Sequence, residues 1–169
     1  MALQLYLVRH GIAEDRAKDG QDASRALTEE GVERLREIGA GLKAIDVRWD
    51  LVLTSPLVRA RQTADVLLQE IGGKHTRLEV TTALIPDAEV ESVLAALPAF
   101  DGADASDSSI ALVSHEPLMG ELAGHLLGTA AMPFKKGGVC RIDFEQPPTR
   151  GGGTLKWFAP PKVLRKLDR

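Results

Sequence analysis

Cysteine and aromatic residues are both scarce in this chain of 169 residues. The single cysteine, Cys140, cannot form an internal disulfide, and the sequence contains no CxxC pair. A lone thiol is typical of proteins from reducing compartments. Aromatic residues make up only 4% of the chain, which argues against a surface that stacks nucleotide bases.

Excess charge and long apolar runs are lacking too. The formal net charge is −3, so the chain has no overall attraction for nucleic acid, and an anion site requires a local cluster of cations. No segment approaches the roughly 18 consecutive apolar residues of a membrane span. Residues 1–10 lack the basic start and apolar core of a signal peptide. We therefore expect a cytoplasmic protein that binds neither membranes nor nucleic acid.

The chain is long enough for one domain, residues 1–169, with a full hydrophobic core. Strand-like and helix-like segments alternate along it. We expect strands at 3–8, 50–54, 77–80, 109–114, 139–144 and 154–158. We expect helices at 28–44, 57–71, 89–97 and 117–127, with Thr28 and Ser55 as N-caps of the first two.

This alternation predicts a three-layer α/β/α fold, in which helices cover both faces of a mostly parallel sheet. The last two strands flank a turn rich in proline and glycine, which predicts a hairpin and one antiparallel edge. Residues 99–108 are expected to form a surface loop, and residues 162–169 a solvated end.

Basic side chains follow three of the predicted strands. Arg9, His10 and Gly11 follow the first strand, Arg59 follows the second by a few residues, and His115 follows the fourth. Ligands of open parallel sheets bind beyond the carboxyl ends of the strands, so we expect these side chains to meet at one edge. A hydrophobic core has no need of such an arrangement.

A cluster of this kind suits phosphoryl transfer. Arginine binds phosphate oxygens through two parallel donors and stays charged at any working pH. Helix starts near Pro56 and Pro117 would direct free N–H groups and a positive dipole at the same space. A neutral imidazole can attack phosphorus, and the lack of a side chain at Gly11 leaves room beside His10.

Two other kinds of site remain open at this point. His10, His115 and Glu116 carry metal-ligand groups, although Arg9 and Arg59 would repel a dication. The cluster could also bind phosphate without catalysing a reaction. His75 and His125 follow no strand end, and neither is assigned a role.

Three short motifs make the comparison with a known family specific. They are LVRHG at 7–11, TSPLVRARQTA at 54–64 and LVSHEP at 112–117. Their order and spacing resemble the histidine phosphatase superfamily, which includes the cofactor-dependent phosphoglycerate mutases. The LTEEG segment at 27–31 and the TLKWF segment at 154–158 are similar to the short SixA-type phosphohistidine phosphatases.

The resemblance implies a phosphoglycerate mutase-like fold and a role for each matched residue. His10 would be the nucleophile that carries the phosphoryl group. Arg9, Arg59 and His115 would bind its oxygens and stabilise the transition state, with Gly11 beside them in the substrate site. Water would then release the phosphate, and no metal or other cofactor would be needed.

The resemblance leaves the identity of the general acid open between several residues. Some branches of the family place an acidic residue directly after the second histidine, where this chain has Glu116. Others use a glutamate on an intervening segment, for which Asp87 or Glu89 is the nearest candidate. General acids contribute about 10²–10⁴-fold. They matter least when the leaving group is an imidazole, which is easily protonated.

Chain length bears on the substrate. The segment from Ser55 to Ser114 spans 60 residues and must hold two helices, a strand and a loop, which leaves little for a lid. An open pocket suits phosphohistidine on a protein surface, and such a phosphorylated protein is the expected partner. The alternative is a phosphatase or mutase that acts on a small phosphorylated metabolite.

Overall fold

The computed structural model describes residues 3–99 and 108–169. The surface loop expected at 99–108 therefore falls almost entirely outside the described residues. Within the described part of the chain, no helix has both the length and the apolar character to cross a bilayer.

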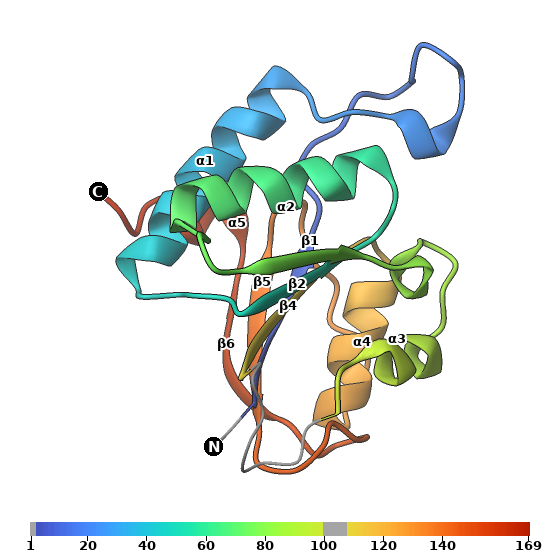
Figure 1. The fold of residues 1–169 in the computed structure, drawn as a ribbon, viewed down its shortest axis with the longest axis vertical. Coiled ribbons are helices and arrows are strands. Elements are labelled where there is room, and N and C mark those ends of the chain that lie inside the picture. Colours follow the sequence, from blue (N-terminus) through green and yellow to red (C-terminus); the bar gives the residue numbers. More distant parts are fainter. Residues whose placement is uncertain (1–2, 100–107) are drawn as a thin grey trace.

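A six-stranded sheet forms the centre of the molecule (Figure 1). Its strands are β1 (Leu3–Arg9), β2 (Leu51–Thr54), β3 (Arg77–Val80), β4 (Ser109–Ser114), β5 (Val139–Phe144) and β6 (Thr154–Ala159). The spatial order is β3-β2-β4-β1-β5-β6. The first four strands run parallel, whereas β5 is antiparallel to both β1 and β6. The predicted parallel sheet with an antiparallel edge is confirmed.

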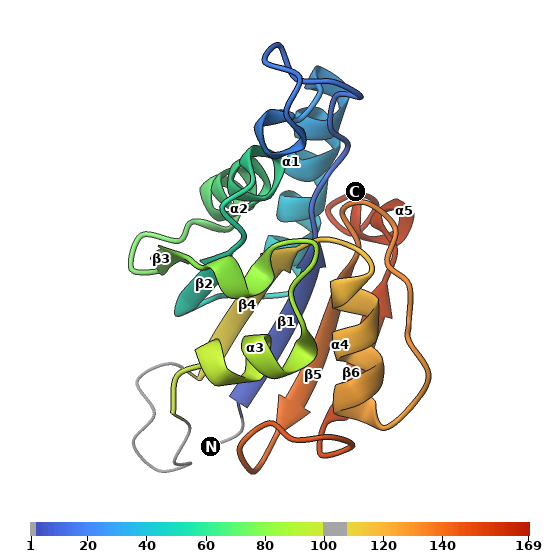
Figure 2. The ribbon, with the colours of Figure 1, turned by 90° about the vertical axis from the view of Figure 1, so that its right-hand side faces the viewer.

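Helices cover both faces of the sheet, as the alternation predicted (Figures 1 and 2). On one face lie α1 (Glu29–Ala44), α2 (Val58–Ile71) and α5 (Pro161–Leu164); on the other lie α3 (Val90–Ala96) and α4 (Leu118–Leu127). Short 3₁₀ turns occur at Asp22–Ser24 (η1) and Thr82–Leu84 (η2). Successive side chains of a strand point to opposite faces, so Leu5 and Leu7 pack beneath α4 while Tyr6 and Val8 pack beneath α1 and α2.

The start of α1 confirms one predicted cap and the start of α2 corrects the other. The Thr28 hydroxyl accepts the N–H of Gly31 at 2.9 Å, as an N-cap does. Ser55, predicted to cap α2, lies too early, because the helix begins at Val58 with Leu57 as its N-cap. The Ser55 hydroxyl still accepts the N–H of Leu57, at 3.2 Å, so it shapes the turn that leads into α2.

The expectation of a solvated end at 162–169 holds for six of its eight residues, which are exposed, and fails at Leu164 and Arg165. Leu164 in α5 is fully buried against α1, where a Cβ on Gly41 would overlap its carbonyl oxygen. The guanidinium of Arg165 bonds Glu37 of α1 at 2.9 Å. Lys162 and Lys166 remain exposed. The last segment is thus anchored by Leu164 and by the ion pair of Arg165 with Glu37, and it displays its two lysines.

Candidate active site

The two histidines of the motifs meet at the carboxyl edge of β1 and β4. These strands are neighbours in the sheet, and the N–H of His10 donates to the carbonyl of Ser114 at 3.0 Å. The imidazole centroids of His10 and His115 lie 5.1 Å apart. Both residues are buried, with 6% and 2% of their surface exposed. Two polar side chains from distant parts of the sequence therefore share one enclosed space.

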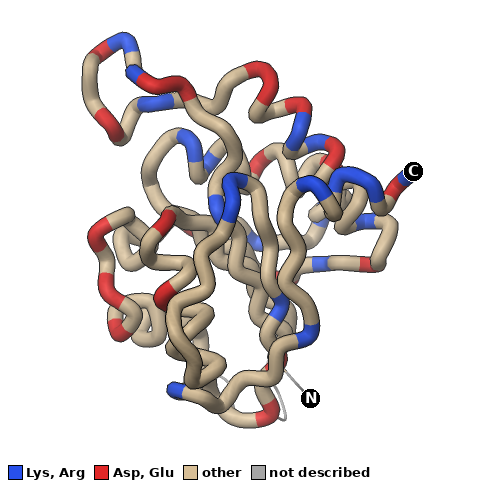
Figure 3. Tube along the Cα trace, turned by 180° about the vertical axis from the view of Figure 1, so that it is seen from behind, with Lys and Arg blue, Asp and Glu red and all other residues tan. Residues whose placement is uncertain are grey.

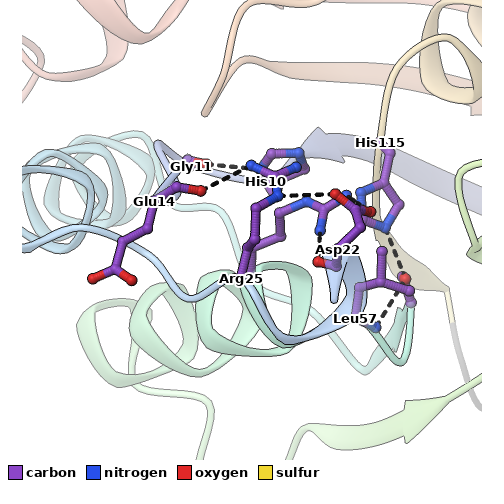
Figure 4. Close-up of polar contacts among 9 residues, drawn as sticks. His10, Gly11, Glu14, Asp22, Arg25, Leu57 and His115 are labelled. Carbon is purple, nitrogen blue, oxygen red and sulfur yellow. Dashed lines mark hydrogen bonds and ion pairs between the residues drawn. The ribbon is translucent and has the colours of Figure 1, made fainter. Parts of the chain in front are cut away.

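A backbone contact fixes which nitrogen of His10 is free. Nδ1 lies 2.7 Å from the carbonyl oxygen of Gly11 (Figure 4). A carbonyl only accepts hydrogen bonds, so Nδ1 must carry the hydrogen, and Nε2 keeps its lone pair. The N–H of Gly11 in turn donates to the Thr63 hydroxyl at 3.0 Å. His10 is thereby held in the tautomer that a nucleophile attacking through Nε2 requires.

The structure gives a different reason for glycine at position 11 from the expected one, which was room beside His10. A Cβ here would lie 2.7 Å from Cδ1 of Leu35 and 3.4 Å from a methyl of Leu27. The close approach is therefore to the apolar side chains beneath α1. The missing side chain lets the end of β1 pack tightly while both backbone groups of Gly11 bond the site.

Burial and nearby positive charge keep His10 neutral. Loss of solvent lowers the pKa of His10 to about 4. The hydrogen bond to Gly11 opposes this shift, and the charges of Arg59, Arg9 and Lys136 add to it. At neutral pH the ring is an uncharged base with a lone pair available, which is the form that can attack an electrophile.

His115 is buried and neutral for similar reasons. Burial, followed by the charges of His10 and Arg59, lowers its pKa to about 3. Its Nε2 lies 2.8 Å from the Ser55 hydroxyl, and its Nδ1 is buried without a partner among the described residues. Where the Ser55 hydroxyl donates to Nε2, the ring hydrogen sits on Nδ1 and is ready to donate to a ligand.

Arg59 comes from the first turn of α2 and is only 4% exposed. Its Nη1 donates to the backbone carbonyl of Asp22 at 2.9 Å, and its Nη2 to the carboxylate at 3.1 Å. The same carboxylate accepts from Nε of Arg25 at 2.8 Å (Figure 4). The η1 turn is therefore held over the site by two arginines.

Arg9 contacts the loop that leads into β5. Its Nη1 donates to the carbonyl of Phe134 at 2.7 Å. The N–H of Gly137 reaches the carbonyls of Arg9 and His10, each at 3.1 Å. Because β5 is antiparallel, its starting loop lies at the same edge as the ends of the parallel strands. That loop also carries Lys136, whose charge acts on His10.

Three buried nitrogens of this cluster have no hydrogen-bond partner within the described residues. They are Nε of Arg9, Nε of Arg59 and Nδ1 of His115. Buried donors in proteins are nearly always paired, so unpaired ones require an explanation. A tetrahedral oxyanion accepts several hydrogen bonds at once and matches donors of this kind. The arrangement can hold a phosphoryl group next to a neutral imidazole.

The three candidate acids occupy different surroundings. Oε1 of Glu116 accepts the N–H of Gly120 at 3.0 Å and that of Phe134 at 3.2 Å. Asp87 and Glu89 are exposed and line a surface groove beside α3 and α4. The structure thus brings together Arg9, His10, Arg59 and His115, ties Glu116 to the backbone nearby, and leaves Asp87 and Glu89 outside the histidine cluster.

Sequence reasoning missed Asp22, Arg25, Lys136 and the carbonyl of Phe134. The first two lie in a polar stretch without periodicity, and the others precede a strand instead of following one. No group of three or more His, Cys, Asp or Glu side chains that could hold a metal ion occurs in the parts of the chain that the structure describes.

The depressed pKa values of the two histidines give an expectation for acid titration. The folded imidazoles bind protons less tightly than the unfolded ones, whose pKa is 6.5. The contribution of these two rings to folding stability is therefore fully present above about pH 6.5 and is lost as pH falls toward their folded pKa values. In an NMR titration of the imidazole Cε1–H signals, we expect two rings to remain neutral at pH 5. His10→Gln identifies one of them, and midpoints near 6.5 for both would contradict the burial.

Three comparisons with known proteins agree with this geometry. The model of the histidine phosphatase superfamily (branch 1) matches residues 5–85. Phosphohistidine phosphatase SixA of Escherichia coli is 31% identical over 96% of this chain and 97% of its own. A solved structure of the protein histidine phosphatase SixA complexed with tungstate superposes with a TM-score of 0.84, at 29% identity, over 96% of this chain and 99% of that one.

A partial match comes from an enzyme of another activity. A 2,3-bisphosphoglycerate-dependent phosphoglycerate mutase of Bradyrhizobium diazoefficiens is 42% identical, but over only 47% of this chain and 40% of that enzyme. The match to SixA, in contrast, extends over nearly the full length of both chains. On this evidence the chain belongs to the histidine phosphatase superfamily, in its SixA-like branch.

Proposed function

We propose that the chain hydrolyses phosphohistidine on a protein substrate through a phosphohistidine formed on its own His10. The observation that carries this proposal is the state of His10, a buried neutral imidazole whose Nδ1 is held by Gly11 and whose Nε2 is free. Arg9, Arg59 and His115 lie close to it, and each has a buried nitrogen without a partner among the described residues.

The reaction proceeds in two displacements. The Nε2 lone pair attacks phosphorus, so that an N–P bond forms on His10 while the N–P bond of the substrate breaks. The electron pair of that bond leaves with the substrate imidazole, which takes up a proton. Water then attacks the phosphoryl group and loses a proton to solvent, the electron pair returns to Nε2, and phosphate departs. Arg9, Arg59 and His115 stabilise the oxygens in both steps.

The proposed reaction needs little help from a general acid. The backbone N–H groups of Gly120 and Phe134 both donate to Oε1 of Glu116 and hold this side chain toward α4 and the loop before β5. Its role as general acid stays a prediction, and these contacts favour a positioning role, in which Glu116 fixes the loop that binds Arg9. An imidazole leaving group suits a site without a strong acid.

The substrate class is supported by the relatives and by the chain length. The relative that matches nearly the whole chain is a phosphohistidine phosphatase, and its solved counterpart binds tungstate, a tetrahedral oxyanion like phosphate. Between β2 and β4 the described residues form only α2, β3, η2 and α3. A small phosphorylated metabolite is the second candidate, favoured by the partial match to a phosphoglycerate mutase.

A panel of substrates tests the proposal. We expect kcat/KM for a phosphohistidine protein to exceed that for sugar phosphates and phosphoglycerates by at least about 100-fold, because the leaving imidazole needs little acid assistance. Phosphate release is measured with the wild type and with His10→Gln as the blank. A preference of similar size for the metabolites would refute the proposed substrate.

A further inference from the structure

We propose that a basic groove beside α5 docks an acidic segment of the phosphorylated protein substrate next to His10. This inference rests on the proposed function and adds the chemistry of the partner. The groove, of about 430 Å³, is lined by Pro161 and six basic residues: Arg34, Lys135, Lys162, Arg165, Lys166 and Arg169. We call it the tail groove.

Intramolecular ion pairs leave much of this charge unneutralised. Arg34 pairs with Glu30 at 2.6 Å, and Arg165 and Arg169 share Glu37, at 2.9 and 3.7 Å. The three lysines of the tail groove form no ion pair with any described residue, and all three are exposed. Six cations therefore face two carboxylates, in a chain whose overall charge is −3.

A short loop connects the tail groove to the active site. Lys135 lines the groove, the next residue, Lys136, acts on the charge of His10, and Gly137 donates to the His10 carbonyl. A Cβ on Gly137 would approach Pro161, which also lines the groove, at 3.7 Å. One loop thus joins the nucleophile to the groove. A substrate with phosphohistidine at His10 would extend past these lysines.

Charge complementarity identifies the occupant as an acidic protein segment. Figure 3 shows Lys and Arg close together beside the C-terminus, in a molecule where acidic residues outnumber basic ones. Among the described residues, no aromatic side chain lines the tail groove to stack a base, which argues against single-stranded nucleic acid. Exposed lysines of this kind raise association rates and select partners through electrostatic attraction that salt screens.

The test uses two peptides of equal length, each with one phosphohistidine. One carries four Asp or Glu residues beside it, and the other carries Asn or Gln at those positions. The variant Lys162→Glu/Lys166→Glu reverses two exposed groove charges. The matched control, Arg48→Glu/Lys74→Glu, reverses two exposed cations that line a different surface cleft. Free phosphohistidine serves as a substrate too small to reach the groove.

We expect wild type and control to favour the acidic peptide about tenfold in kcat/KM at low salt. The groove variant and 0.5 M NaCl should abolish this preference, with turnover of free phosphohistidine unchanged. Equal kcat/KM for both peptides in the wild type would overturn the inference.

Fluorescence anisotropy with the unphosphorylated acidic peptide separates the groove from the activity. The wild type could bind the peptide, with binding lost in the groove variant, and yet hydrolyse no phosphohistidine. That result would refute the proposed function but support the docking surface. Tighter binding of single-stranded DNA of equal charge than of the peptide would overturn the choice of partner.

Discussion

Replacing His10 with alanine or glutamine is expected to abolish turnover and the capture of acid-labile phosphate on the enzyme. No other described side chain presents a neutral nitrogen held in this way by the backbone beside the unpaired arginine donors. We expect kcat to fall by at least about 10⁴-fold, as it does when a covalent nucleophile is removed. Rapid quenching with ³²P-labelled substrate measures the phosphoenzyme directly.

A matched histidine variant controls for general effects. His75 is exposed in the turn before β3 and lies outside all three motifs, so His75→Ala should retain wild-type turnover. Because Nδ1 of His10 bonds the backbone, His10→Gln keeps a polar side chain at the position and limits any loss of folding. Undiminished turnover in a folded His10→Gln enzyme would refute the covalent mechanism.

Replacing Arg59 is expected to produce the second-largest loss. Its guanidinium is buried, its Nε has no acceptor among the described residues, and its charge acts on both histidines. Loss of a preorganised donor from a transition state costs about 10²–10³-fold, and of an arginine at a phosphoryl group up to about 10⁵-fold. We expect Arg59→Met to lower kcat/KM by about 10³-fold and to weaken tungstate binding.

Arg61 provides the comparison for Arg59. It lies on the same helix, is exposed and forms no ion pair with the described residues, so Arg61→Met should change kcat/KM less than twofold. Arg59→Lys keeps the charge and removes the planar pair of donors, and we expect it to recover only part of the loss. Full activity of Arg59→Lys would show that charge alone is needed there.

Much of the fold and the centre of the site followed from local patterns in the sequence. The strand at 109–114 was predicted with the bounds that β4 has, because its apolar run is short and follows polar residues. The clustering of His10, Arg59 and His115 followed from one rule, that the carboxyl ends of parallel strands share an edge. Local sequence patterns were enough to predict those strands and helices whose formation depends mainly on their own residues.

The remaining parts of the site depend on contacts between distant segments. The rule about carboxyl ends overlooks an antiparallel strand, whose starting loop reaches the same edge, and that loop supplies Phe134 and Lys136. The η1 turn lies in a stretch without hydrophobic periodicity, so no local pattern predicts its position. It is held in place by hydrogen bonds from Arg59 and Arg25 to Asp22. Ser55 looked like a helix cap because its hydroxyl also suits one, yet it bonds His115.

The contact between Nδ1 of His10 and the Gly11 carbonyl joins neighbouring residues of the chain. A bond this local depends little on how distant parts of the molecule move. Adding a phosphoryl group to Nε2 leaves the hydrogen on Nδ1, so the bond remains when the ring is modified. In the proposed mechanism, one orientation of the imidazole then serves both attack on the substrate and release of phosphate, and the cycle requires no rotation of the His10 side chain.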